Sequence, residues 1–339
     1  MYLGILGAGS WGTAMAILWA RHGHKVRLWG RSETTIADYR AAGRNLRFLP
    51  DAPFPPGLTL SADLKQTVQD NSLLALAVPL QAYRGLLSGM LPLLTPHHRL
   101  ILLSKGMELD THKLPSQIAT HVLGPDWADR VFPLSGPSFA KEVAQNQPTT
   151  VVLGGRQEQS LRELQNALNC PSFRMYRNLD VVGIELAGAL KNVIAIASGI
   201  TSGLGLGHNT RAGLITRGLS EISRLGVALG ARRETFSGLA GLGDLVLTCT
   251  GDLSRNLQVG MALGKGDSLE RVLNQLGMVA EGVHTCRAAK KLAAELKVEV
   301  PITSAVNSIL YEGLSPRAAL TALMTRSLKP ETQAYQSLY

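Results

Sequence analysis

Lys191 is the residue whose surroundings most directly predict chemistry. It lies in residues 185–198, the most apolar helix-like stretch of the sequence, and the residues one helical turn before and after it carry no charge. A buried ammonium without a partner is costly, so such a lysine has a lowered pKa or binds an anion. The alternative is a lysine whose stem packs against the protein while its amino group reaches water. The other motifs of the chain favour the first interpretation.

A glycine motif near the start of the chain predicts a dinucleotide site. Gly7, Gly9 and Gly12 form the pattern GxGxxG directly after an expected strand, Tyr2–Leu6, and before an apolar helix. The first glycine permits a tight turn, the second lets the backbone approach a pyrophosphate, and the third lets helix and strand pack closely. The N–H groups of the helix N-terminus then face the phosphates. This placement favours a dinucleotide site over a glycine-rich turn without a ligand.

The end of the second expected strand, Lys25–Trp29, bears on the choice of cofactor. A site that prefers NAD usually has an acidic residue here to hold the ribose 2′-hydroxyl. This chain has Arg31 at that place, and Glu33 follows two residues later. Because an arginine can pair with a 2′-phosphate, we expect NADP or NAD as the cofactor, with NADPH favoured. A solvated surface arginine is the alternative.

Two further candidate positions follow expected strands. Lys105 comes after Arg99–Leu103, and a turn that contains Ser138 comes after Val131–Leu134. Ligands of open α/β sheets bind beyond the carboxyl ends of the strands, so we expect both positions to face a ligand crevice. Plain turns are the alternative for both.

The second half of the sequence contains a candidate phosphate seat. Ser254 has the residue type of a helix N-cap, and Arg255 and Asn256 open the expected helix, so an arginine side chain and backbone donors would meet there. A capped surface helix without a ligand is the alternative. Asp244 ends a run of small flexible residues ten positions earlier, and Glu281 lies in another loop that by itself decides nothing.

The order of expected elements indicates an α/β fold followed by a helical one. Short apolar runs alternate with helical segments in the first half, which is typical of a doubly wound parallel sheet. Further strands are expected at Leu73–Val78, Thr149–Leu153 and Phe173–Tyr176. Beyond residue 180 apolar residues recur at helical spacing, at 184–200, 210–229, 257–263, 284–296 and 302–311. We therefore predict a Rossmann-like doubly wound domain over residues 1–178, an all-α helical domain over 179–330 and a polar tail over 331–339.

Composition excludes several classes of protein. The net charge is +9, but the basic residues are dispersed and no Lys/Arg block is interleaved with aromatics, so we expect a small anionic substrate rather than nucleic acid. The three cysteines lie far apart without a CxxC pair, which argues against a zinc site and a disulfide framework and suits a reducing compartment. No secretory signal opens the sequence, and charged or polar residues interrupt its most apolar stretches, so we expect no membrane span.

A set of longer strings extends these motifs across nearly the whole chain. In order they are GAGSWG, SKG, SGPSFAKEV, ELAGALKNVIAIASGI, NTRAGLITRGL, TFSGLAGLGDLVLTCT, SRN and VAEG. Together they resemble the NAD(P)-dependent glycerol-3-phosphate dehydrogenases of the bacterial type. The resemblance implies a soluble cytoplasmic enzyme that reversibly reduces dihydroxyacetone phosphate to sn-glycerol 3-phosphate for glycerophospholipid synthesis. It also implies a homodimer.

The same resemblance implies roles for individual residues. The family's catalytic lysine matches Lys191. Its substrate contacts match Lys105, Gly136, Ser138, Asp244, Ser254, Arg255 and Asn256. Its cofactor contacts, besides the glycine loop, match Ser10, Trp11, Arg31, Lys105, Ala140, Arg255, Val279 and Glu281. The chain departs from the family pattern at Ser202 and His208, where acidic residues are usual, and at Leu80, where serine is frequent.

These roles suggest a mechanism. Lys191 would donate a proton to the substrate carbonyl oxygen as hydride arrives at C2, and would accept one in reverse. Lys105 would polarise the carbonyl or balance phosphate charge, and Asp244 would orient Lys191. Two alternatives stay open: a related two-domain dehydrogenase that acts on a hydroxy acid or ketoacid, and a dinucleotide-binding sensor or inactive scaffold.

Overall fold

The chain divides into two structural units. The computed structural model describes residues 1–276 and 280–331. The first unit comprises residues 1–104 and 115–181, and the second comprises residues 105–114 and the chain from residue 182. The expected boundary at residues 178 and 179 is close to this division, but no local pattern indicated that residues 105–114 group with the helical unit.

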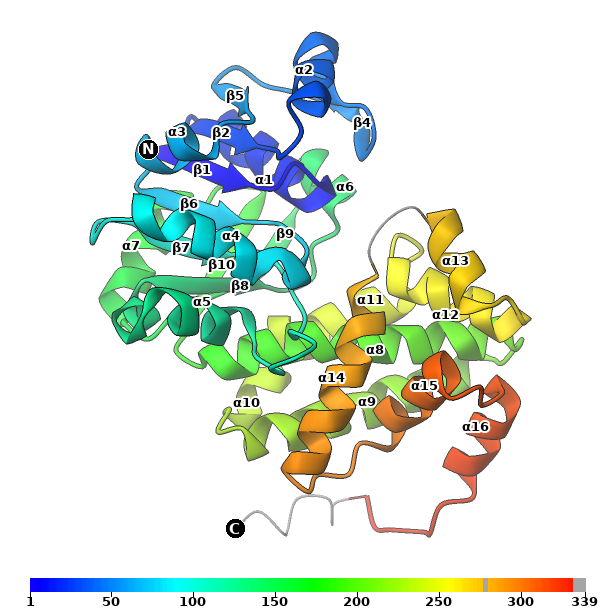
Figure 1. Cartoon of the computed structure of the whole chain (residues 1–339). Helices are drawn as coiled ribbons and strands as arrows, with labels where there is room; N and C mark the ends of the chain where they lie inside the picture. Colours follow the sequence, from blue (N-terminus) through cyan, green and yellow to red (C-terminus); the bar gives the residue numbers. More distant parts are fainter. Residues whose placement is uncertain (277–279, 332–339) are drawn as a thin grey trace. The chain divides into compact units, whose positions relative to one another are not determined.

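The first unit is built on one eight-stranded sheet in the order β10-β9-β8-β7-β6-β1-β2-β5 (Figure 1). Its strands are β1 (Tyr2–Leu6), β2 (Lys25–Trp29), β5 (Leu58–Ser61), β6 (Leu73–Leu76), β7 (Arg99–Leu102), β8 (Val131–Ser135), β9 (Thr149–Gly154) and β10 (Phe173–Asn178). All neighbouring pairs are parallel except β8 and β9, so β9 and β10 run opposite to the other strands. From β1 the chain adds β2 and β5 on one side of that strand, and then crosses to its other side to form β6. Ligands of such sheets usually bind where the strand order reverses in this way, here between β1 and β6.

Alternation along the strands builds a core on each face of this sheet. In β6, Leu73 and Ala75 join a cluster that contains residues of α1 (Ser10–Arg21) and α7 (Glu158–Leu168). Leu74 and Leu76 join a cluster that contains residues of α4 (Tyr83–Met90) and α5 (Pro115–Leu123). Successive side chains of a strand point to opposite faces, so a strand buried on both sides is apolar throughout. The helices are α1 (Ser10–Arg21), α2 (Glu33–Ala42), α3 (Leu64–Gln69), α4 (Tyr83–Met90), α5 (Pro115–Leu123), α6 (Ala140–Ala144) and α7 (Glu158–Leu168).

The second unit is helical and is organised around α8 (Val181–Gly203). Residues 183–201 of this helix are all buried, which explains a sequence that is apolar on every side. The other helices are α9 (His208–Ala228), α10 (Arg233–Phe236), α11 (Asp244–Thr250), α12 (Arg255–Lys265), α13 (Leu269–Leu276), α14 (Glu281–Glu295), α15 (Pro301–Tyr311) and α16 (Pro316–Met324). Most of them contribute to one hydrophobic core with α8.

By length and composition alone, α8 is also long and apolar enough to cross a membrane, although it carries Glu185 and Lys191. In this structure 89% of its most apolar window is buried inside the protein. Its apolar surface is therefore covered by the other helices of the unit, as in the core helix of a globular domain.

The structure confirms the predicted fold class and adds elements that the sequence did not indicate. Strand β5 and a small antiparallel pair, β3 (Arg44–Asn45) with β4 (Leu49–Pro53), were not predicted. Gly238–Asp244 was expected to be a flexible run, but residues 239–243 form a π-helical turn that leads directly into α11. The polar tail predicted over residues 331–339 lies, from residue 332 on, outside the described residues.

Candidate active site

The glycine loop of the first unit has the geometry of an anion cradle. Gly7 has a φ of +124°, and a Cβ there would lie 2.7 Å from the backbone of Ala77. A Cβ on Gly12 would lie 2.0 Å from the Gly7 carbonyl oxygen, whereas one on Gly9 would meet nothing within 4 Å. The fold itself thus requires Gly7 and Gly12, while Gly9 faces open space. A pyrophosphate fits this arrangement, since it would approach the backbone at Gly9.

The first turn of α1 supplies donors to the same place. The helix begins at Ser10 with Gly9 as its N-cap, without a side-chain cap and without an acidic residue in the first turn. Ser10 and Trp11 are half-buried there, and the unused N–H groups and the helix dipole favour an anion. Arg31 is exposed in the segment between β2 and α2, where a cofactor 2′-phosphate would need a cation.

A second glycine turn follows β8 in the same unit. Gly136 has a φ of +129°, and a Cβ there would lie 2.9 Å from the Cα of Val151, so only glycine fits. The Ser138 hydroxyl donates to the Gly136 carbonyl oxygen at 3.0 Å, and Ala140 begins α6. A phosphate that accepted a hydrogen bond from Ser138 would therefore require this hydroxyl to turn.

The second unit brings two lysines onto one buried carboxylate. Lys191 Nζ donates to Asp244 Oδ1, and Lys105 Nζ donates to Asp244 Oδ2 at 2.5 Å. Lys191 Nζ also donates to Thr248 Oγ1 at 2.8 Å, and the Thr248 hydroxyl donates to the Asp244 carbonyl oxygen at 2.6 Å. Lys191 is 8% exposed and Asp244 is 1% exposed. The amino group of Lys191 thus points to a buried partner, which rules out the snorkelling alternative.

Local structure places these groups. Lys191 lies within α8, whereas Asp244 is the first residue of α11 and Thr248 follows one turn later, on the same face of that helix. The entry to α11 depends on Gly241, where a Cβ would lie 2.0 Å from the Phe236 carbonyl oxygen. The small residues before Asp244 therefore permit close packing rather than flexibility.

Burial and neighbouring charges together lower the pKa values of both Lys191 and Asp244. Burial is the largest effect on Lys191 and lowers its pKa to about 8; Asp244 opposes the shift, and the charge of Lys105 adds to it. For Asp244, burial favours the neutral acid, but Lys105 and Lys191 outweigh it and hold the pKa of the carboxyl below its ordinary value. Near pH 8, Lys191 can therefore gain or lose a proton beside a permanent carboxylate, as a general acid or base requires.

The predicted phosphate seat is a capped helix start, as expected. The Ser254 hydroxyl accepts the Leu257 N–H at 3.2 Å and so caps α12. Both ends of the Asn256 side-chain amide form hydrogen bonds. Its Nδ2 group donates to Asn192 Oδ1 at 2.9 Å, and its Oδ1 accepts the Gly282 N–H at 3.1 Å. A substrate contact by Asn256 would thus use its backbone N–H or the remaining hydrogen of its amide.

Arg255 stands beside this network at the first position of α12. It is half-buried; burial lowers the pKa of its guanidinium, and the nearby carboxylate of Glu281 opposes this shift. Glu281 is the first residue of α14, so the two predicted ligand residues come from different helices of one unit. Val279, the remaining predicted cofactor contact, lies outside the described residues.

The structure shows two groups in the cluster that sequence reasoning missed. Thr248 could have been found from its position four residues after Asp244, once a helix was assigned there. Asn192, next to Lys191, bonds to Asn256 across 64 positions of sequence, and no local signal indicates such a pair. The sequence indicated that Lys191 would have a lowered pKa or bind an anion, and Asp244 supplies a carboxylate for it within the protein.

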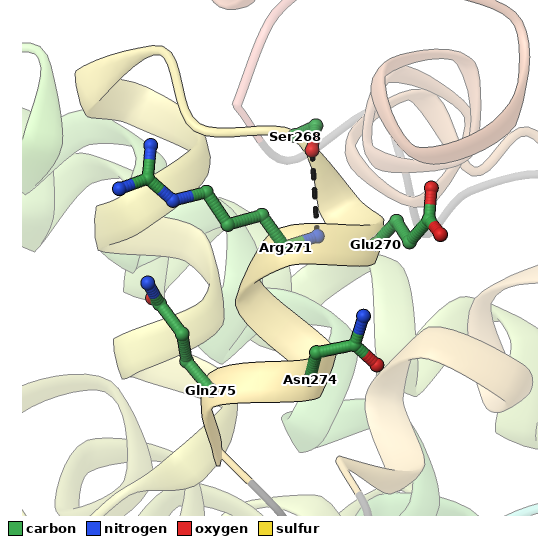
Figure 2. A pocket seen from close by; sticks show the side chains of 5 residues that line it. All are labelled: Ser268, Glu270, Arg271, Asn274 and Gln275. Atoms are coloured by element: carbon green, nitrogen blue, oxygen red, sulfur yellow. Dashed lines mark hydrogen bonds between the residues drawn. The ribbon is translucent and has the colours of Figure 1, made fainter.

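A depression elsewhere on the second unit contains none of these residues. It has a volume of about 490 Å³. Figure 2 shows its lining side chains, which lie at the start of α13 and along it: Ser268, Glu270, Arg271, Asn274 and Gln275. Ser268 Oγ accepts the Arg271 N–H at 3.4 Å, and Arg271 pairs with Asp267 at 3.3 Å. The Arg271 side chain is 67% exposed, so this is a solvated helix start rather than a built site.

Comparison with known protein families gives a match over most of the chain. Residues 2–161 match the model described as NAD-dependent glycerol-3-phosphate dehydrogenase N-terminus, and residues 180–321 match the corresponding C-terminus. The chain is 50% identical to a protein of Geobacter metallireducens named glycerol-3-phosphate dehydrogenase [NAD(P)+], over 97% of this chain and 98% of that protein.

Solved structures agree with this match. A glycerol-3-phosphate dehydrogenase crystal structure from Coxiella burnetii is 41% identical with a TM-score of 0.91, and covers 96% of this chain and 99% of its own. The corresponding enzyme of Saccharomyces cerevisiae is 26% identical with a TM-score of 0.81, over 95% and 98% of the two chains. With its glycine cradle and its lysine–aspartate cluster, this chain belongs to the family of NAD(P)-dependent glycerol-3-phosphate dehydrogenases.

Proposed function

We propose that the protein reduces dihydroxyacetone phosphate to sn-glycerol 3-phosphate with NAD(P)H, reversibly, and that Lys191 is its general acid and base. The observation that carries this proposal is the buried cluster in which Lys191 and Lys105 share the carboxylate of Asp244. Reduction of a ketone builds negative charge on the carbonyl oxygen, and that charge needs both a proton donor and a fixed cation nearby.

Each group of the cluster then has a part in the reaction. The bound cofactor supplies the hydride for the substrate C2. Lys191 donates its proton to the carbonyl oxygen, while Asp244 and Thr248 fix the direction of its N–H bonds. Lys105 places its side-chain ammonium beside the developing oxyanion. In the oxidative direction Lys191, as the free amine, removes the hydroxyl proton from the substrate.

The substrate phosphate is assigned to the start of α12. Backbone N–H groups of its first turn, the capping residue Ser254 and the Arg255 guanidinium offer donors and positive charge there. Gly136 and Ser138 are proposed as further substrate contacts on the basis of the family resemblance. Ala140, Val279 and Glu281 are proposed as cofactor contacts on the same basis.

The cofactor preference and the setting are also proposals. Arg31 supports NADPH over NADH, because an exposed guanidinium at the end of β2 suits a 2′-phosphate. We further propose a cytoplasmic homodimer that is not embedded in a membrane, does not bind nucleic acid and supplies glycerophospholipid synthesis. The dispersed basic residues and the burial of α8 support the absence of nucleic-acid and membrane partners.

The central test is NADPH oxidation, followed by absorbance, with dihydroxyacetone phosphate as substrate. Lys191→Ala is expected to lower kcat by at least about a hundredfold, since general acid catalysis contributes on the order of 10²–10⁴. NADPH affinity, measured by fluorescence titration, should stay within about twofold. Lys290→Ala removes an exposed lysine that pairs with Glu312 and serves as the matched control with unchanged turnover. Substantial turnover by Lys191→Ala would sink the assignment of the general acid.

The same assay separates the alternatives. Turnover with ketoacids but not with dihydroxyacetone phosphate would favour a related two-domain dehydrogenase. NADPH binding without turnover of either substrate class would favour a sensor or scaffold. NADH in place of NADPH gives the cofactor preference, and we expect the higher kcat/KM with NADPH.

A further inference from the structure

Residues 105–114 group with the helical unit although the chain before and after them, up to residue 181, belongs to the first unit. This segment begins with Lys105, whose amino group bonds to Asp244. The lysine therefore reaches the cluster from a loop, whereas Lys191 and Asp244 lie on helices of the unit. A loop residue holds a defined position only where the loop itself is fixed.

The segment closes on itself as a tight turn. The Glu108 N–H donates to the Lys113 carbonyl oxygen at 3.0 Å, and the His112 N–H donates to the Glu108 carbonyl oxygen at 3.0 Å. The Thr111 hydroxyl donates to the Glu108 carboxylate. Residues 108–113 thus form a unit with few internal degrees of freedom.

Two apolar residues flank this turn and fix it to the helical core. Met107 precedes it and Leu114 follows it; they are 0% and 2% exposed, and both belong to the core cluster built around α8. His112 Nδ1 adds a polar contact, 3.4 Å from Glu295 Oε1 at the end of α14. The turn is therefore anchored in the helical core at both of its ends.

We propose that Met107 and Leu114 are positioning residues for Lys105, which hold its amino group on Asp244 by anchoring residues 107–114 in the helical core. The proposal rests on the proposed function of the lysine cluster. Only Gly106, with a φ of +137°, separates Lys105 from Met107, so the Lys105 Cα lies within about 7 Å of the Met107 Cα. When Met107 is fixed, the Lys105 side chain can search only a small volume around Asp244.

The test is kinetic and uses the shape of the pH profile. Met107→Ala is expected to lower kcat/KM for dihydroxyacetone phosphate about ten- to a hundredfold, because small misplacements of catalytic groups have effects of this size. It should also move the pH limb assigned to Lys191 upward by about half a unit or more, since a displaced Lys105 no longer lowers the pKa of Lys191. Lys105→Met should produce the same upward shift.

Three further variants separate positioning from stability. Met107→Leu keeps the volume and should retain wild-type kinetics. Leu225→Ala makes a comparable cavity in α9, in the same core, and should lower the melting temperature without moving the pH limb. Thr111→Val opens the turn at an exposed residue and should shift the limb in the same direction by less.

The outcomes are distinct. The proposal is overturned if Met107→Ala folds and leaves the limb in place while Lys105→Met moves it, or if Leu225→Ala moves the limb as far as Met107→Ala does. If neither Lys105→Met nor Lys191→Ala affects turnover, the proposed function fails instead.

Discussion

At the scale of single residues, the reactivity of Lys191 depends on a balance between burial and two neighbouring charges. Burial favours the neutral amine, the Asp244 carboxylate favours the ammonium, and the Lys105 ammonium again favours the amine. Burial and these two charges together give Lys191 a pKa of about 8, so both of its protonation states are accessible near neutral pH.

This balance predicts the pH dependence of the reaction in both directions. Oxidation of glycerol 3-phosphate needs Lys191 as the free amine, so its kcat/KM should rise by about tenfold per pH unit below about pH 8 and level off above it. Reduction needs the ammonium, so its kcat/KM should be constant below that pH and fall above it. Initial rates across pH 6–10, on the order of one point per half unit, would locate the limb.

If the kcat/KM profiles of oxidation and reduction bend at the same pH with opposite slopes, one group acts as the base in oxidation and as the acid in reduction. A limb near 10.4, the ordinary pKa of a lysine, would contradict the argument from burial. Asp244 has a lowered pKa, so it should contribute no limb in this range.

At the scale of elements, the helices that carry Lys191 and the proposed phosphate seat are joined by an unusually close crossing. Gly199 on α8 faces Gly260 on α12, and a Cβ on Gly260 would lie 2.0 Å from the Ile196 carbonyl oxygen. Gly203 and Gly264 repeat the contact one turn further along, where a Cβ on Gly264 would lie 2.4 Å from the Ile200 carbonyl oxygen. The backbones therefore touch, which fixes the start of α12 relative to the helix that carries Lys191.

We expect Gly260→Ala to destabilise the protein by about 1–3 kcal/mol, as overpacking usually does, because backbone rather than a flexible side chain stands in the way. Gly213→Ala is the matched control: this exposed glycine of α9 has nothing within 4 Å of the added Cβ. There the exchange should be neutral or stabilising by about 0.5–1 kcal/mol. Urea unfolding curves would measure both changes, and equal effects would argue against a close crossing.

This crossing also shows what sequence could predict at this scale and what it could not. The helix at 184–200 and the cap at Ser254 were predictable, because apolar periodicity and capping are local properties. The position of Lys105 within the helical unit was not, since it depends on Met107 and Leu114 joining a core formed by residues far along the chain. The antiparallel direction of β9 could not be predicted either, because a strand buried on both faces has the same apolar pattern in either direction.

At the scale of the whole molecule, the positive net charge complements the negative charge of the proposed substrate and cofactor. The chain carries 34 basic and 25 acidic residues, a net charge of +9 that no single basic block accounts for. Such a distribution raises the local concentration of anions around the protein without creating a nucleic-acid surface. Both the proposed substrate and its cofactor are phosphate esters, so the field of the molecule favours their encounter.

The field predicts a salt dependence that distinguishes substrate encounter from chemistry. With cofactor saturating, kcat/KM for dihydroxyacetone phosphate should fall several-fold between low salt and about 0.3 M salt, where screening is strong, while kcat changes little. Dihydroxyacetone, which lacks the phosphate, is the control and should show a flat kcat/KM. If both substrates lost activity in parallel, salt would be acting on the protein itself, and long-range attraction of the phosphate would be excluded as the cause.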